Sequence, residues 1–357
     1  AAPCIRRAVM GQSASQLEDR YFVQKVKLGQ GSFGIVWRAV DRHRGNTVAI
    51  KQLDKASLPR RGVSREDIER EVSMMRACCH ENITRLFDTF EDNNNIYLAL
   101  EYCDGGDFGD KVKERGWAIE EAEVASFMRQ MCAAIGTLHS LSICHRDIKP
   151  DNFMVAGPST LKLCDFGLAV YLPRGQVARD KCGTPAFMAP EQHALPKRSP
   201  GYSFAVDIWA AGVSMYMVMF GGKHPFITDS GHLEEQKLMT GQLDFSYRDA
   251  SKGFFNFGAM NMRFSDESRS LCSRMVEPDP RRRISSEDAA SFPWLHALGG
   301  QDRARQLPPA PPPGAPPPAI GTPPPVPGAE WPGSPQQRPG PGYKLGSPPP
   351  MPARGCE

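Results

Sequence analysis

The hydrophobic pattern of this chain changes once, near residue 101, and the change limits the folds open to it. Residues 21–101 alternate apolar and polar side chains in short β-branched runs such as TVAIKQL and IYLAL, which is typical of half-buried strands. One segment in this part, SREDIEREVSMMRA, has helical spacing. Residues 105–298 repeat apolar positions at helical spacing, as in VASFMRQMCAAIGTLHSL. The pattern therefore predicts an α+β chain with a small β-rich part carrying one helix and a larger, mostly helical part.

A second change, at Gly299, marks the end of the part expected to fold. Residues 299–357 hold 20 of the chain's 33 prolines. Such a segment cannot bury enough apolar surface to offset its ordering entropy, so we predict a disordered tail. Its RQLPPAP stretch places a basic residue before a PxxP core, which suits a proline-reading domain. A plain spacer is the alternative.

The N-terminal leader contains MGQSAS, which fits the pattern for myristate on Gly11 if translation begins at Met10. A chance match in a flexible leader is the alternative. One myristoyl chain gives only marginal membrane binding, so weak, reversible association is the most that we expect.

Composition narrows the partners and the compartment. A formal net charge of +3 over 357 residues is too small for a nucleic-acid footprint. The ten cysteines include no CxxC pair, and we interpret them as reduced thiols of a cytoplasmic protein. The most apolar run, Ile208–Phe220, is too short to span a bilayer and is predicted to be a buried helix. We expect a monomer.

Three glycines follow the first predicted strand, since LGQGSFGIVWRAV places Gly29, Gly31 and Gly34 in GxGxxG spacing. The residues after them alternate and are β-branched, so the loop is predicted to join two strands instead of opening a helix. Glycine lets backbone amides approach phosphates without a Cβ in the way. A simple tight hairpin is the alternative.

Lys51 of VAIK lies in the middle of an apolar strand. A buried ammonium needs an anionic partner, and Glu71 of the predicted helix is the preferred one. Glu69 is the alternative, less favoured because of its different helical angle. A surface lysine on an edge strand would need no partner at all.

The most informative cluster is CHRDIKPDNFM, followed by LCDFGLA. Pro150 disfavours helix for the residue before it, which predicts a polar loop carrying Asp147, Lys149 and Asn152. Asp165 follows a strand-like LKLC. An amide and a carboxylate oxygen suit a Mg²⁺ ion that keeps waters and bridges nucleotide phosphates.

Taken in order, GxGxxGxV, VAIK, HRDIKPDN, DFG and APE resemble the signature set of the eukaryotic protein kinases, over about residues 21–295. The resemblance implies a bilobal protein kinase fold with an N-lobe of about residues 21–101 and a C-lobe of about 105–298, between a leader, 1–20, and the tail, 299–357. It also implies ATP and Mg²⁺ as cofactors and protein substrates with Ser or Thr hydroxyls.

The resemblance implies roles for single residues. Asp147 accepts or orients the substrate hydroxyl proton, Lys149 steadies the transferred phosphate, and Glu71 orients Lys51, which holds the α and β phosphates. Metal ligation is implied for Asn152 and Asp165. The residues implied to surround the nucleotide are Leu28, Gly29, Gly31, Gly34, Val36, Ala49, Lys51, Glu101, Cys103, Asp107, Met154 and Asp165.

Other implied roles are structural. Met75, Leu86, His145 and Phe166 are expected to form an apolar stack that joins the lobes. Asp207 is expected to anchor the catalytic loop, Glu191 to pair with Arg283, and Leu100 to precede the adenine-reading hinge, residues 101–103.

Lys149 marks the serine/threonine version of the catalytic loop. HENITRLFDTFEDNNNIYLALEYCDGGDF and DPRRRISSEDAASFPWL are similar to the calcium/calmodulin-dependent group, especially the calcium-dependent protein kinases. In that group, acidic residues at the positions of Asp107 and Asp151 bind an arginine three residues before the target, so the resemblance implies basic-directed specificity.

The chain also departs from that group. It contains no DxDxDGxxxxxE loop, so direct calcium sensing is not supported. The segment LDFSYRDASKGFFNFGAMNMRFSDES differs from the family pattern, and Phe292 replaces the usual His of HPW. An inactive scaffold is the competing function class. Loss of Lys51, Asp147, Asn152 or Asp165 would favour it, and all four are present.

One position raises a question about regulation. Asp180 stands two residues before Cys182, where a hydroxyl open to phosphorylation would be expected. We predict that this carboxylate replaces a loop phosphate and accepts a bidentate contact from Arg146, so that activity needs no loop phosphorylation. A solvated loop charge is the alternative.

Overall fold

The computed structural model describes residues 12–31, 34–116, 119–173, 175–246 and 264–297. The predicted tail, Gly11, and most of the departing segment between residues 243 and 268 lie outside these ranges.

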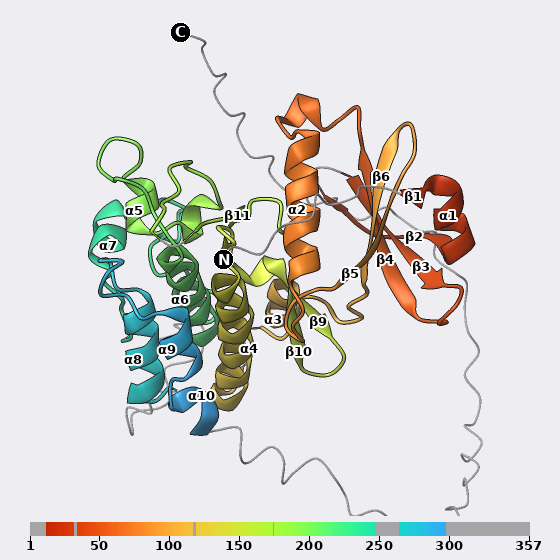
Figure 1. Ribbon diagram of the computed structural model, residues 1–357. Helices are drawn as coiled ribbons and strands as arrows, with labels where there is room; N and C mark the ends of the chain where they lie inside the picture. Colours follow the sequence, from red (N-terminus) through yellow and green to blue (C-terminus); the bar gives the residue numbers. More distant parts are fainter. Residues whose placement is uncertain (1–11, 32–33, 117–118, 174, 247–263, 298–357) are drawn as a thin grey trace, which may run out of the picture. The chain divides into compact units, whose positions relative to one another are not determined.

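The small lobe, residues 12–101, is built on a six-stranded sheet of order β1-β5-β6-β4-β3-β2. Its strands are β1 Gln12–Ser13, β2 Tyr21–Gly31, β3 Gly34–Asp41, β4 Thr47–Asp54, β5 Leu86–Glu91 and β6 Asn95–Glu101. Four of these were predicted from alternation. The 3₁₀ turn Pro59–Arg61 and helix α2 (Arg65–Ala77) follow β4, and α2 stands beside the sheet in Figure 1.

Helix α2 begins where the sequence predicts it. Ser64 caps the helix by accepting a hydrogen bond from the Asp67 backbone N–H, and the Asp67 carboxylate accepts one from the Ser64 N–H. This reciprocal capping box fixes the first turn. The helix then buries Ile68, Glu71 and Val72 toward the sheet and the large lobe.

The predicted leader, residues 1–20, extends too far along the chain. β1 pairs in parallel with β5, and helix α1 (Ala14–Arg20) follows it directly. Leu17 of α1 is 5% exposed and belongs to a small core cluster with Tyr21 and Phe90. The small lobe therefore begins before Tyr21, because α1 covers apolar side chains of the sheet.

The large lobe, residues 105–297, is mostly helical, as predicted. Its helices are α3 Phe108–Glu114, α4 Glu121–Ser140, α5 Pro190–His193, α6 Ala205–Met219, α7 Glu235–Thr240, α8 Asp266–Met275, α9 Ser286–Ala290 and α10 Trp294–Ala297. Two small sheets, β10-β9-β7 and β11-β8, supply the strands on either side of the polar loop that carries Asp147. Their strands are β7 Gly106–Asp107, β8 Ile143–Cys144, β9 Phe153–Ala156, β10 Thr160–Leu163 and β11 Val170–Tyr171. The 3₁₀ turns Pro150–Asn152 and Pro185–Phe187 complete it.

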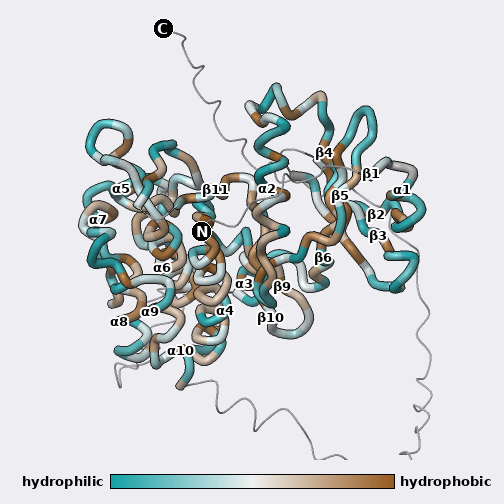
Figure 2. The backbone as a smooth tube through the Cα atoms, viewed as in Figure 1, coloured by the Kyte–Doolittle hydropathy of each residue, from teal (hydrophilic) through white to brown (hydrophobic). Residues whose placement is uncertain are grey.

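The most apolar run is confirmed as a buried helix. Nearly every residue of α6 is buried, and Trp209 and Val213 are fully buried. Figure 2 shows the brown, hydrophobic positions concentrated inside the helical lobe and teal positions on α7. Within the described part of the chain, no helix is both long and apolar enough to cross a membrane.

The main core cluster joins the two lobes. It includes Met75 of α2, Leu86 of β5 and Phe166 of the large lobe. The eight cysteines in the described ranges are free thiols.

Candidate active site

The polar loop after β8 gathers its functional side chains around one carboxylate. Lys149 is extended (φ −164°), as expected for a residue before proline, and a 3₁₀ turn follows. This turn returns Asn152 to Asp147, whose Oδ2 accepts hydrogen bonds from Asn152 Nδ2 at 2.9 Å and from Lys149 Nζ at 2.8 Å. Asp147 Oδ1 accepts two more, from the Thr184 backbone N–H at 2.9 Å and from its hydroxyl at 2.7 Å.

These four donors determine the charge of Asp147. Burial opposes ionisation, but hydrogen bonds from Lys149 and Thr184 and the Lys149 charge hold the pKa of Asp147 below its ordinary value. The carboxylate is therefore ionised at neutral pH and oriented on both oxygens.

A buried carboxylate of α6 fixes the loop, as expected for Asp207. Asp207 Oδ2 accepts from the His145 backbone N–H at 2.9 Å and Oδ1 from the Arg146 N–H at 2.8 Å. Arg146 is in the left-handed region (φ 70°), a conformation that costs energy for a non-glycine residue and that these bonds hold in place. His139 of α4 adds a third contact to Asp207 at 3.0 Å.

The strand lysine has the expected partner. Lys51 Nζ lies 3.2 Å from Glu71 Oε1, whereas the alternative, Glu69, pairs with Arg65 on its own helix at 3.1 Å. Lys51 Nζ is also 4.0 Å from Asp165 Oδ1. Burial would lower the pKa of Lys51, but the Glu71 and Asp165 charges outweigh it and raise the pKa above its ordinary value.

The DFG segment faces two ways. Phe166 is fully buried and packs edge-on against the ring of His145, with centroids 5.4 Å apart. Asp165 is left-handed (φ 60°), and its side chain is 57% exposed on the Lys51 side. The burial of Phe166 thus leaves the Asp165 carboxylate free to face solvent and a ligand.

The glycine loop joins β2 to β3, as predicted. Gly29 pairs with Val36, and Gly31 with Gly34. A Cβ on Gly34 would lie 1.7 Å from the Gln52 carbonyl oxygen, so β4 requires glycine there. A Cβ on Gly29 would meet nothing within 4 Å, so the fold does not require glycine at Gly29.

The residues implied to surround the nucleotide come from adjoining strands. Ala49 pairs with Leu100 across β4 and β6, and Val36 pairs with Lys51 across β3 and β4. Met154 of β9 pairs with Asp107 of β7. Of the other members, Cys103 is buried, Leu28 is 39% exposed, and the Glu101 carboxylate lies 2.9 Å from Lys162 Nζ.

Asp107 lies in an acidic environment. It caps α3 through the Asp110 N–H at 2.9 Å. Burial and the charges of Asp151 and Asp110 raise its pKa to about 6. A Cβ on Gly109 would lie close to both Asp107 Oδ1 and the Asp151 backbone, so the two carboxylates implied to bind arginine belong to neighbouring turns.

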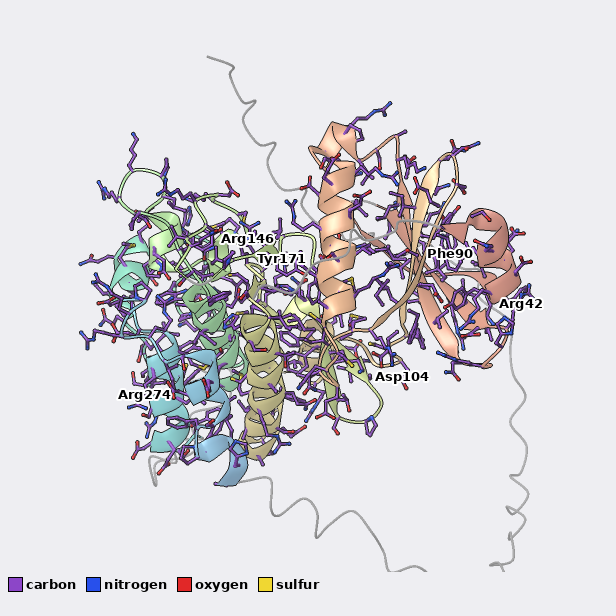
Figure 3. The ribbon with its side chains drawn as sticks, in the orientation of Figure 1. Arg42, Phe90, Asp104, Arg146, Tyr171 and Arg274 are labelled. Atoms are coloured by element: carbon purple, nitrogen blue, oxygen red, sulfur yellow. The ribbon has the colours of Figure 1, made fainter. Side chains whose placement is uncertain are left out.

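The contact predicted for Asp180 is only partly present, and the bidentate geometry is wrong. Arg146 Nη1 lies 3.8 Å from Asp180 Oδ2, and Asp180 is 85% exposed. Arg146 instead donates to the Leu168 carbonyl at 2.6 Å and to the Tyr202 hydroxyl at 3.2 Å. These bonds engage Nε and Nη1 of the guanidinium, and the contact of Nη1 with Asp180 stays long. Figure 3 labels Arg146 beside Tyr171, whose strand β11 pairs with β8.

Two polar residues at this site were not predicted in these contacts. The Thr184 hydroxyl accepts a hydrogen bond from Lys149 Nζ and donates one to Asp147 Oδ1. Tyr202 donates to the Asp180 carbonyl at 2.7 Å, and its backbone forms a two-bond bridge with Ala178. Thr184 could have been found from its place in the stretch Gly183–Thr184–Pro185 shortly before APE, whereas the sequence around Tyr202 gives no such signal.

The donor set fits the expected metal. No group of three or more His, Cys, Asp or Glu side chains that could hold a metal occurs in the described ranges. Asn152 uses its Nδ2 for Asp147, so its Oδ1 oxygen is the atom that could bind a metal, and Asp165 supplies an exposed carboxylate. Two oxygen ligands with room for water and phosphate are what Mg²⁺ prefers.

Comparisons with known proteins agree with this geometry. The family model described as "Protein kinase domain" matches residues 22–295. The chain is 34% identical to Calcium-dependent protein kinase 10 of Arabidopsis thaliana over 285 residues, 79% of this chain and 49% of the relative. It is 35% identical to Calcium-dependent protein kinase 20 of Oryza sativa subsp. japonica over 276 residues, 76% of this chain and 47% of the relative. It is 32% identical to Calcium-dependent protein kinase 3 of Plasmodium yoelii yoelii over 300 residues, 83% of this chain and 52% of the relative. The chain thus spans about half the length of the curated relatives it matches.

Proposed function

Because this chain belongs to the protein kinase domain family, we propose that it is an ATP-dependent protein serine/threonine kinase. The observation that carries the proposal is the Asp147 carboxylate, ionised and held by Lys149, Asn152 and Thr184. A scaffold has no need of four convergent donors on one partly buried carboxylate.

In this proposal Asp147 orients the attacking hydroxyl. Its depressed pKa makes it a weak base, so its main contribution is to hold the hydroxyl proton in line. Lys149 lies 2.8 Å from Asp147 and can contact the transferred phosphate from the same side. Phosphoryl transfer passes through a loose transition state, so positioning and charge neutralisation provide most of the catalysis.

The nucleotide would be held from both lobes. Lys51, fixed by Glu71, would contact the α and β phosphates, and the backbone at Gly29 would approach them. Asn152 and Asp165 would hold Mg²⁺. When bound, ATP supplies the γ-phosphate and Mg²⁺ neutralises part of its charge.

The substrates we propose carry an arginine before the target hydroxyl. Asp107 and Asp151 are neighbouring carboxylates, and the Asp107 carboxylate accepts a hydrogen bond from the Asp110 backbone N–H. A guanidinium with two oxygen partners would lower the repulsion between them.

The remaining expectations concern the setting of the enzyme. We propose a cytoplasmic monomer, with a proline-reading domain bound to residues 299–357 and weak membrane association if Gly11 is myristoylated. Sedimentation of the full chain and partition of acylated and Gly11→Ala forms onto vesicles test these points.

One assay tests the activity. The full chain is incubated with labelled ATP and a Ser/Thr peptide library, with and without calcium and calmodulin. We expect transfer to peptides with arginine three residues before the acceptor. No turnover, beside turnover by a control kinase, would support the scaffold. A preference for an acidic residue at that position would reject the basic-directed specificity.

A further inference from the structure

A cavity of about 480 Å³ lies in the large lobe between α5, the turn that follows it, and α7. Figure 1 shows α5 and α7 next to each other. Leu195 and Leu238 are 7% and 1% exposed and form an apolar floor, whereas Met239 is 47% exposed at the rim. We call this feature the α5–α7 groove; the residues that define it are Lys181, Leu195, Lys197, Arg198, Leu238 and Met239.

The rim of the groove is positively charged. Lys181, Lys197 and Arg198 are exposed there, and the described lining contains one carboxylate, Glu235. Burial and the Lys181 ammonium hold the pKa of His193 below its ordinary value, so this ring adds no charge at neutral pH. The surface is therefore complementary to an acidic partner with an apolar side chain.

Hydrogen bonds connect the groove to the segment that contacts Asp147. His193 Nε2 donates to the Pro185 carbonyl at 3.1 Å, and Lys181 Nζ donates to the His193 carbonyl at 3.4 Å. Pro185 directly follows Thr184, whose hydroxyl bonds Asp147. A peptide whose acceptor hydroxyl reaches Asp147 could therefore continue along Pro185 into the groove.

We propose that the α5–α7 groove binds an acidic segment of the protein substrate, seated by an apolar side chain, at a distance from the phosphorylated hydroxyl. This inference rests on the proposed kinase function. The surface around Asp107 carries the opposite charge, so a substrate that matches both has an arginine before the acceptor and acidic residues beyond it. Such a charge pattern would also fix the direction of the bound peptide.

Two peptides test the groove. Both carry an arginine three residues before the acceptor serine, and both continue after it with a spacer, a leucine and four further residues. These four are glutamates in one peptide and glutamines in the other. For the full chain we expect a KM for the glutamate peptide about tenfold below that for the glutamine peptide, and this ratio should shrink as ionic strength rises.

Charge reversal on the rim identifies the site. In Lys197→Glu/Arg198→Glu we expect the KM for the glutamate peptide to rise until it is about equal to the KM for the glutamine peptide. The KM for the glutamine peptide and both kcat values should stay unchanged. The matched control, Arg44→Glu/Arg60→Glu, makes the same charge change at exposed positions of the small lobe and should leave the ratio as it was. Met239→Ala should raise the KM for both leucine-containing peptides. It should not change the KM for versions of these peptides that carry glycine in place of the leucine.

Several results would overturn the inference. Equal KM values for the two peptides in the unmodified chain, or a ratio that survives rim reversal, would reject an acidic occupant. A KM that rises equally for both peptides in the rim variant would indicate a structural role only. A dimer in sedimentation that the rim variant abolishes would assign the groove to a second copy of the chain. Turnover of neither peptide would reject the proposed function itself and the inference with it.

Discussion

Two arginine–carboxylate pairs hold the segment from Asp165 to Glu191, and they differ in almost every physical respect. At its end, Arg283 contacts Glu191 through two parallel bonds of 2.7 and 3.0 Å, and Arg283 is fully buried. In its middle, Arg146 reaches Asp180 through one 3.8 Å contact, and Asp180 is 85% exposed. The same pair of charges is thus part of the core at one place and a surface contact at the other.

The difference lies in the other partners of each arginine. Arg283 also donates to the backbone carbonyls of Glu277, Ala205 and Pro278, so the guanidinium joins several segments of the large lobe. Arg146 donates to the Leu168 carbonyl and to the Tyr202 hydroxyl, and its contact with Asp180 is the longest of the three. Burial and shared donors, more than formal charge, set what an ion pair contributes.

The largest expected effect is on the buried pair. Arg283→Ala leaves the Glu191 carboxylate, 9% exposed, without its cation, so we expect the free energy of unfolding to fall by about 3–5 kcal/mol. Urea titration followed by circular dichroism measures this. Arg281→Ala is the control, because Arg281 is 92% exposed in the same turn and should change little. Equal effects of the two variants would erase the distinction drawn between the pairs.

Two kinds of contact could be predicted from sequence. Some lie within a local motif, and others join two motifs whose pairing the resemblance to the family implies. Pro150 predicts the extended Lys149, and the resemblance pairs Glu191 with Arg283 across 92 residues. Asp180 shows the limit. The sequence correctly predicted a contact between Asp180 and Arg146. It could not predict that other acceptors also bind the guanidinium, because the fold brings them there.

Other parts could not be predicted because short elements give little pattern. β1 has 2 residues and α1 has 7, too few for a hydrophobic period to stand out, so both were placed in the leader. Tyr202 acquires its contacts only when residues 201–202 lie against Ala178; a Cβ on Gly201 would lie 2.7 Å from the Ala178 carbonyl. The α5–α7 groove likewise needs three separate segments.

The next effect tests whether neutral bonds hold the middle of the segment. Tyr202→Phe removes the hydroxyl that joins Arg146 to the Asp180 carbonyl. We expect kcat to fall about tenfold, since a lost buried hydrogen bond costs about 1–2 kcal/mol of segment ordering. The KM for ATP should not change. Steady-state kinetics measures both values, with hydrogen exchange at Ala178 as a direct readout.

Tyr216→Phe is the matched control for that variant. It deletes a comparable bond, from the Tyr216 hydroxyl to the Asp244 carbonyl at 2.7 Å, on the far side of α6 from the catalytic loop. If it lowers kcat as much as Tyr202→Phe does, the effect is general destabilisation, and Tyr202 has no particular role in positioning the segment.

Asp107 is a third carboxylate that we propose to pair with an arginine. In this case the arginine belongs to the substrate. The pKa of Asp107 is about 6, so the carboxylate is charged at pH 7.5 and mostly neutral at pH 5.5. A neutral carboxyl does not attract a guanidinium, so the KM for an arginine-containing peptide should rise about fourfold as the pH falls between these values. Asp107→Asn should abolish this dependence, and a peptide lacking the arginine should not show it. A dependence that persists in Asp107→Asn must arise from another group.

The smallest effect decides what Asp180 does. An exposed pair at 3.8 Å contributes little, so we expect Asp180→Ala to lower kcat about twofold, and less at high salt because the contact is screened. The control is Asp229→Ala, an exposed carboxylate on another surface loop.

Phosphatase treatment should leave the activity of the unmodified chain intact, because the Tyr202 bonds already hold the segment without a phosphate. A large loss in Asp180→Ala would mean that the exposed charge, and not the neutral network, orders the segment. No loss of kcat at all would mean that Asp180 is a solvated loop charge. The segment would then need no phosphorylated hydroxyl at this position, because the Tyr202 bonds alone hold it.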